Sequence, residues 1–144
     1  MSKEPFNNPD YKPDENTKQK IENLHSEGMK LNEIYLINAD MKKSKLVNVD
    51  MSGSDLTRSD FSGSSMYGAN LEGANLFKAN FEGVNLKSAN LCNCNLLGAD
   101  FFNTKLNHVE WGEKYKVINE KDAETALLSR DTEKARIKYK EAED

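Results

Sequence analysis

Large apolar side chains recur at every fifth residue through most of this chain of 144 residues. A period of five matches neither the 3.6-residue period of an α-helix nor the two-residue period of a strand. The chain must therefore turn one corner in each repeat, which is typical of a solenoid. The series consists of Leu31, Leu36, Met41, Leu46, Met51, Leu56, Phe61, Met66, Leu71, Leu76, Phe81, Leu86, Leu91, Leu96, Phe101, Leu106 and Trp111.

From Ala39 onward, a smaller residue, most often Ala, Ser or Val, lies two positions before each large one. Both positions are predicted to point inward, and the second must be small because four chain segments converge near the axis. The Asn or Asp between them can hydrogen-bond backbone groups at a turn. Glycine at the fifth position, as in Gly73 and Gly83, makes a positive φ accessible.

The unit is clearest in residues 69–73 (Ala-Asn-Leu-Glu-Gly) and 74–78 (Ala-Asn-Leu-Phe-Lys). This pattern strongly resembles the pentapeptide-repeat family, and the resemblance covers about residues 29–112. It implies a right-handed quadrilateral β-helix in which four repeats make one coil. We therefore expect an all-β solenoid of about four coils.

With twenty residues in each coil, residues twenty positions apart should stack in four inward columns. The three phenylalanines of the series, Phe61, Phe81 and Phe101, then fall in one column. A random distribution would rarely place all three together, so this clustering independently supports the twenty-residue register.

The N-terminal flank divides into two parts. Residues 1–15 are polar and contain all three prolines of the chain, which predicts a flexible tail. Residues 16–28 are predicted to form a short helix that caps the first coil. Asn16 or Thr17 can cap this helix, and Gly28 is placed to end it.

The C-terminal flank, residues 113–144, is rich in Lys, Glu and Ala and predicts α-helices. We expect one helix over 120–129 and a second over 134–143, with Asp131 or Thr132 as its cap. These helices could dock on the solenoid, pair with a second copy of the chain, or remain partly frayed. The residues expected to make the contact are Leu127, Leu128, Ala135 and Tyr139.

Charge and hydropathy exclude several classes of function. The net charge is −4, and residues 29–112 contain 9 acidic and 8 basic residues, so nucleic-acid binding is not favoured. No run of apolar residues is long enough to span a membrane, and the N-terminus lacks the apolar core of a secretory signal. A cytoplasmic protein with no membrane partner is expected.

Candidate chemical groups have structural explanations. Cys94 takes a small inward position and Cys92 an outward one, so neither a disulfide nor shared metal coordination is expected. His25 and His108 lack a ligand partner at a suitable spacing. Aspartates replace Asn at the turn position and should form the same bonds. We therefore expect no catalytic residues, no metal and no cofactor.

One set of outward positions is unexpectedly apolar. We call Ile37, Thr57, Phe77 and Leu97 the apolar column, and Phe102 lies on the next face beside Leu97. A contiguous apolar surface usually marks a contact. Either the C-terminal segment of the same chain covers it, which we slightly favour, or it binds a partner or a second subunit.

Two functions follow. The first is a non-enzymatic structural scaffold or protein-interaction module with an unidentified protein partner, or a homodimer formed through the C-terminal helices or the apolar column. The second comes from the resemblance, because some pentapeptide-repeat proteins mimic DNA, bind type II topoisomerases such as gyrase and confer protection from quinolones. Those proteins are longer and strongly acidic, whereas this repeat region is nearly balanced in charge, so the second function is the alternative.

Overall fold

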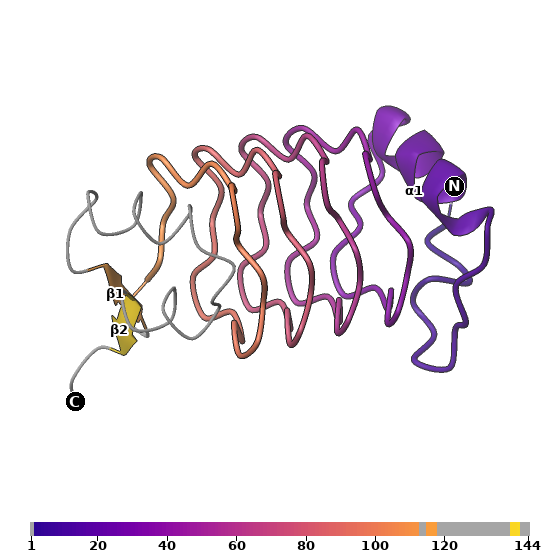
Figure 1. Ribbon diagram of the computed structural model, residues 1–144. Coiled ribbons are helices and arrows are strands. Elements are labelled where there is room, and N and C mark those ends of the chain that lie inside the picture. The colour runs from indigo at the N-terminus through magenta and orange to yellow at the C-terminus, as the bar shows by residue number, and fades with distance from the viewer. Residues whose placement is uncertain (1, 113–114, 118–138, 142–144) are drawn as a thin grey trace.

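Successive coils stack side by side in the computed structural model, which describes residues 2–112, 115–117 and 139–141. They lie between helix α1 (Thr17–Ser26) at one end of the molecule and strands β1 (Tyr115–Val117) and β2 (Tyr139–Glu141) at the other (Figure 1). Parallel bridges join residues twenty positions apart, from the pair Tyr35 and Asp55 to the pair Asn90 and Glu110. Four repeats therefore complete one coil, and this part of the chain is a β-helical solenoid.

Backbone hydrogen bonds in a twenty-residue register hold the coils together. Leu56 donates its amide to the carbonyl of Asn75 at 2.9 Å, and Arg58 donates to Phe77 at 2.8 Å. Asn75 in turn donates back to Ser54 at 2.9 Å. The same three bonds recur from coil to coil, so each repeat is tied to both of its neighbours.

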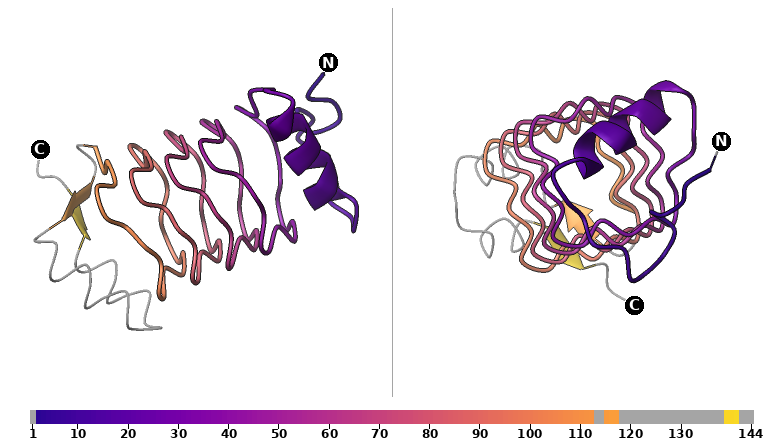
Figure 2. Two further views of the ribbon diagram at one scale, coloured as in Figure 1. Left: turned by 90° about the horizontal axis from the view of Figure 1, so that it is seen from above. Right: turned by 90° about the vertical axis from the view of Figure 1, so that its right-hand side faces the viewer.

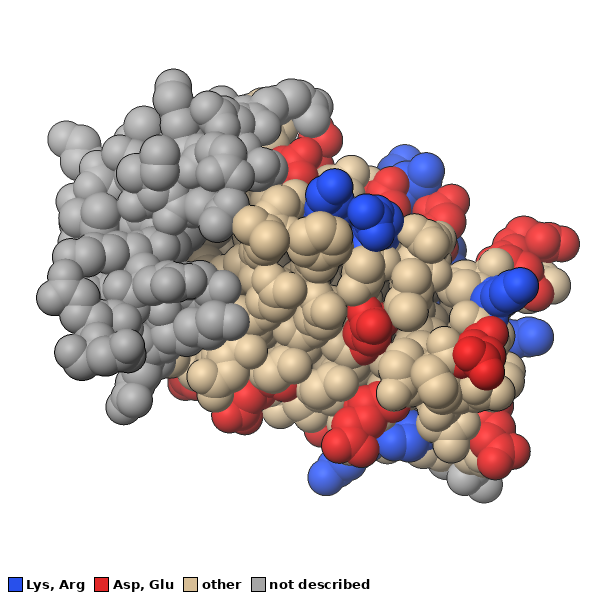
Figure 3. All heavy atoms as spheres, turned by 90° about the horizontal axis from the view of Figure 1, so that it is seen from below, with Lys and Arg blue, Asp and Glu red and all other residues tan. Residues whose placement is uncertain are grey.

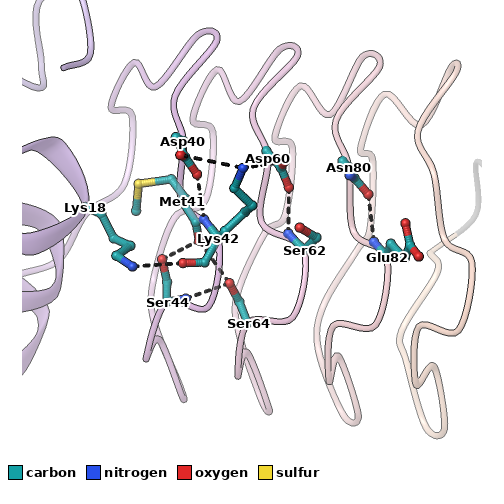
Figure 4. Close-up of polar contacts among 10 residues, drawn as sticks. All are labelled: Lys18, Asp40, Met41, Lys42, Ser44, Asp60, Ser62, Ser64, Asn80 and Glu82. Carbon is teal, nitrogen blue, oxygen red and sulfur yellow. Dashed lines mark hydrogen bonds and ion pairs between the residues drawn. The ribbon is translucent and has the colours of Figure 1, made fainter. Parts of the chain in front are cut away.

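The two remaining amides of a repeat are bonded within the repeat itself. Ser59 donates to the carbonyl of Leu56 at 3.0 Å, and Thr57 donates to the side-chain Oδ1 of Asp55 at 3.1 Å. Eleven Asn or Asp side chains accept the amide two residues later in this way, which confirms the predicted turn role. Figure 4 shows three of these turns, at Asp40, Asp60 and Asn80.

The inward columns form one continuous core along the axis. The predicted phenylalanine column is confirmed, because the ring centroids of Phe61 and Phe81 are 5.5 Å apart and those of Phe81 and Phe101 are 5.7 Å apart. Both pairs are stacked, with interplanar angles of 3° and 12°. Stacking of equivalent side chains therefore repeats the register of the backbone.

Buried hydroxyls at the small inward positions also join the coils. Ser64 donates to the carbonyl of Met41 at 3.0 Å and accepts the amide of Ser44 at 2.9 Å. Thr104 donates to the carbonyl of Phe81 at 2.6 Å. A polar side chain is tolerated in this core because each buried hydroxyl finds a backbone partner.

The residue two positions after each large one has a positive φ, from residue 33 to residue 108 without exception. Six of these residues are glycines, as the sequence predicted, but ten carry a side chain, including Arg58 at 56° and Lys78 at 54°. This conformation costs an ordinary residue roughly 1–2 kcal/mol. The amides at these positions donate between coils, so the ladder compensates for the strain.

Helix α1, Thr17–Ser26, lies across the N-terminal end of the coils (Figure 2). Ile21 is fully buried there. The amides of Gly28 and Met29 donate to the carbonyls of His25 and Leu24, which ends the helix as a Schellman motif with Gly28 at a φ of 86°.

The helix start differs from the prediction in one respect. Asn16 occupies the N-cap position but its side chain makes no capping bond. The hydroxyl of Thr17 instead accepts the amide of Asp14 at 2.8 Å and bonds the Tyr11 hydroxyl at 2.6 Å. The side chain of Thr17 is therefore used to hold the preceding loop.

The prediction of a flexible tail over residues 1–15 is wrong for the part that is described. Phe6 is only 1% exposed and packs against Tyr11, with ring centroids 4.9 Å apart. Its carbonyl accepts the amide of Tyr35 at 2.8 Å. Burial of one aromatic side chain anchors a segment whose prolines and polar residues predicted a flexible tail.

Side chains from the N-terminal segment replace the coil that is missing before the first one. In later coils the outward carbonyls accept amides from the preceding coil, as Thr57 does from Asn38 at 2.9 Å. In the first coil, three of these carbonyls accept hydrogen bonds from basic side chains of the N-terminal segment instead. The pairs are Lys3 with Asn32, Lys18 with Lys42 and His25 with Val47, at 2.9, 3.0 and 2.8 Å.

At the C-terminal end, strands β1 (Tyr115–Val117) and β2 (Tyr139–Glu141) pair antiparallel. The predicted helix over 134–143 is therefore wrong at Tyr139–Glu141, where backbone pairing with β1 replaces helical bonding. Its apolar spacing was irregular, and Tyr and Val favour strands. The helix predicted over 120–129 lies outside the described residues.

The side chain of Cys94 points inward and that of Cys92 points outward, as predicted. Both are free; Cys94 is buried and donates from its Sγ to the carbonyl of Leu71 at 2.9 Å, whereas Cys92 is half-buried. Burial raises the pKa of the Cys92 thiol, and the carboxylates of Glu110 and Glu72 raise it further.

Overpacking a small inward position should test the core directly. Ala79→Leu should lower the free energy of unfolding by about 1–3 kcal/mol, because Ala79 is fully buried in a filled column. The same change at the exposed Glu72 should have little effect. Urea unfolding followed by circular dichroism would measure both, and equal effects would contradict the assignment of inward and outward positions.

Thiol labelling should separate the two cysteines. Cys92 should react first and Cys94 only on unfolding. Because the pKa of Cys92 is raised, its labelling rate should keep increasing with pH beyond the range in which an exposed cysteine levels off. Glu72→Gln together with Glu110→Gln should speed labelling at mildly alkaline pH. Timed alkylation with mass spectrometry measures the rates, and faster labelling of Cys94 would refute the arrangement.

Candidate interaction surface

The register of the coils brings the apolar column together. The bridges Tyr35 with Asp55, Asp55 with Asn75 and Asn75 with Asn95 run beside it, two residues before each of its members. Leu97 is 43% exposed, whereas the other members, Ile37, Thr57 and Phe77, are half-buried. The column is therefore an accessible strip that crosses successive coils.

The other predicted contact residues lie elsewhere. Phe102 is half-buried and belongs to the next column, and its amide donates to Asp100 at 2.9 Å. Tyr139 lies in β2 rather than in a helix. The remaining expected helix contacts, Leu127, Leu128 and Ala135, fall outside the described residues.

Two cations flank the aromatic ring of the apolar column. The guanidinium carbon of Arg58 and the Nζ of Lys78 each lie 5.3 Å from the ring centroid of Phe77. Both distances are within the range of a cation–π interaction. The sequence interpretation missed these two residues, although both directly follow a member of the column.

The N-terminal end of the apolar column opens into a surface pocket of about 720 Å³. Ile37 and Asn38 form one side, and the segment from Pro9 to Pro13 forms the other. The loop that Thr17 holds in place therefore lines a pocket of mixed polar and apolar character next to Ile37.

A second exposed apolar pair lies on another column. Val47 is 45% and Tyr67 46% exposed, and the two occupy equivalent positions in adjacent coils. The sequence interpretation missed this pair, although the two residues have the same twenty-residue spacing as the members of the apolar column.

Seen from below, the solenoid presents a broad uncharged area with charged groups mostly around it (Figure 3).

The carboxylates of the repeat are engaged in structural contacts. Lys42 lies 3.7 Å from Asp40 and 3.9 Å from Asp60, in adjacent coils (Figure 4). Within the described residues, no three His, Cys, Asp or Glu side chains gather as a metal site. No helix in that part of the chain has the length and apolarity needed to cross a bilayer.

Comparison with the solved structure of Rfr23 gives the same fold. Rfr23, a pentapeptide repeat protein from the cyanobacterium Cyanothece 51142, is 34% identical over 57% of this chain and 56% of its own, with a TM-score of 0.56. HetL of Nostoc sp. PCC 7120, involved in heterocyst differentiation regulation, is 26% identical over 60% and 47%, with a TM-score of 0.35. The chain thus spans about half the length of these two proteins.

Full-length QnrB1, a plasmid-mediated fluoroquinolone resistance protein, is 16% identical over 60% of this chain and 71% of its own, with a TM-score of 0.30. No curated protein matches the chain. The family model for pentapeptide repeats matches eight copies over residues 27–58, 34–73, 54–91 and 79–110, which is more than half of the chain. The chain therefore belongs to the pentapeptide-repeat family.

Proposed function

We propose that this protein is a non-enzymatic scaffold that binds a protein partner through the apolar column. The observation that carries the proposal is the accessible strip formed by Ile37, Thr57, Phe77 and Leu97 on a rigid solenoid. Monomeric proteins seldom expose contiguous apolar surface without a use for it.

The energetics favour a preformed binding surface. Every amide of a repeat such as Asp55–Ser59 is already bonded, so the column needs no reordering when it binds. A rigid surface loses little conformational entropy in a complex. Complete burial of a side chain such as Leu or Phe contributes roughly 1.5–3 kcal/mol, and the exposed part of the column supplies a share of that.

Three described residues with potentially reactive side chains bond neighbouring groups of the fold. His25 bonds the carbonyl of Val47, and Cys94 bonds the carbonyl of Leu71. Asp55 accepts both the amide and the hydroxyl of Thr57. These contacts give a structural role to three residues that could otherwise be considered for catalysis, which is consistent with a non-enzymatic scaffold.

A DNA-mimic modulator of a type II topoisomerase is the alternative, and the surface does not favour it. DNA carries one negative charge about every 1.7 Å of its axis. Here Lys42 offsets Asp40 and Asp60, and residues 29–112 contain nearly as many basic as acidic residues. Gyrase supercoiling should therefore be unchanged at increasing concentrations of this protein.

The proposal is tested by purifying the tagged protein from its native cells. A partner should be recovered with the wild type and with the control variant Glu72→Gln/Lys105→Gln. The two substitutions of this control lie at exposed residues away from the column. Phe77→Ser/Leu97→Asn should reduce binding by about tenfold or more, the equivalent of roughly 1.4 kcal/mol. Calorimetry with the purified partner would measure the affinities.

A second copy of the chain as the partner would appear as a dimer in light scattering, and Phe77→Ser/Leu97→Asn should dissociate it. Equal recovery of every partner by the column variant and the control would contradict the proposal. Reproducible turnover of a small molecule would also contradict it.

A further inference from the structure

The apolar column carries two cations without an acidic partner. Arg58 and Lys78 are exposed, and neither forms an ion pair within the part of the chain that the structure describes. Asp55, three residues before Arg58, uses its Oδ1 for the amide and hydroxyl of Thr57, at 3.1 and 2.6 Å. The positive charge beside Phe77 is therefore available to another molecule.

The backbone at both cations is of a kind that favours glycine. Arg58 has a φ of 56° and Lys78 a φ of 54°, whereas the corresponding residue one coil later is Gly98. Two successive coils thus keep long basic side chains in a conformation that disfavours any side chain. Both cations lie 5.3 Å from one ring, so their charges are concentrated at the centre of the column.

We propose that the apolar column recognises an acidic, amphipathic segment of a partner protein, with apolar residues on Ile37, Phe77 and Leu97 and carboxylates on Arg58 and Lys78. This inference rests on the proposed function and specifies the chemistry of its partner. Aromatic residues and arginine are the groups that most often dominate protein interfaces. Complementary charge beside them selects the partner and its register.

The dimensions fit a short segment. The column crosses three coil-to-coil steps of about 4.8 Å each, or about 14 Å, which an extended peptide spans in roughly four to five residues. A segment bound along the column reaches the pocket between Ile37 and the loop from Pro9 to Pro13, which lies at the N-terminal end of the column.

A nucleic acid fits the surface less well. Binding to phosphates usually requires several cations, and residues 29–112 hold 9 acidic against 8 basic residues. The C-terminal segment of this chain is not selected by charge either, since residues 113–144 also contain 9 acidic and 8 basic residues. Both remain as outcomes of the test.

The test is a selection from a random peptide library against the full-length protein. Selected peptides should combine apolar residues with a net negative charge, and fluorescence anisotropy should show about tenfold weaker binding to Arg58→Glu/Lys78→Glu. The matched control is Lys43→Glu/Lys105→Glu, which makes the same change in net charge at exposed sites and includes a positive φ at Lys43. The control should bind the peptides like the wild type.

A second selection, against Arg58→Glu/Lys78→Glu, should yield basic peptides. Circular dichroism of each variant confirms that the solenoid is intact. Selection of neutral or basic peptides by the wild type would overturn the inference. An equal loss of peptide affinity in Arg58→Glu/Lys78→Glu and in the control would also overturn it. So would tighter binding of a single-stranded oligonucleotide, or displacement of the selected peptides by a synthetic peptide of residues 113–144.

The inference and the proposed function can fail separately. A native partner that needs Phe77 and Leu97 but binds Arg58→Glu/Lys78→Glu normally would retain the proposed function and overturn the acidic specificity. A partner insensitive to all four residues would remove both.

Discussion

The twenty-residue backbone ladder is the interaction on which the rest of this molecule depends. A typical repeat such as Asp55–Ser59 directs three amides to neighbouring coils, one to its own turn and one to an Asn or Asp side chain. No amide of that repeat is left unbonded. This complete pairing lets a narrow apolar core support the fold and compensates for positive φ values at residues that carry side chains.

The ladder also decides where the fold needs protection. The first coil has no preceding coil to supply donors, so Lys3, Lys18 and His25 bond its exposed carbonyls. Helix α1 and Phe6 cover the core at the same end. An uncovered end would be a template for further stacking. The outward side chains do not cover the core or an end of the solenoid. Their identity can therefore vary, which allows surfaces such as the apolar column.

Periodic features could be predicted from the sequence, because each repeat confirms the others. The phenylalanine stack, the turn bonds of the aspartates and the opposite directions of Cys92 and Cys94 all follow from position within the repeat. The flanks have no such redundancy. The burial of Phe6 and the strand at Tyr139–Glu141 depend on tertiary contacts that local composition does not encode. The cations around Phe77 were missed for a related reason, since side-chain direction depends on the φ of Arg58 and Lys78.

Urea unfolding of two deletion variants tests the ladder most directly. Deleting residues 51–70 removes one complete coil and joins Asp50 to Leu71 in register, so the shortened protein should unfold cooperatively with its circular dichroism spectrum retained. Deleting residues 51–69 leaves one extra residue at the junction, which shifts inward side chains outward and should abolish cooperative unfolding of the solenoid. Equal unfolding midpoints for the two variants would contradict a fold held by a twenty-residue register.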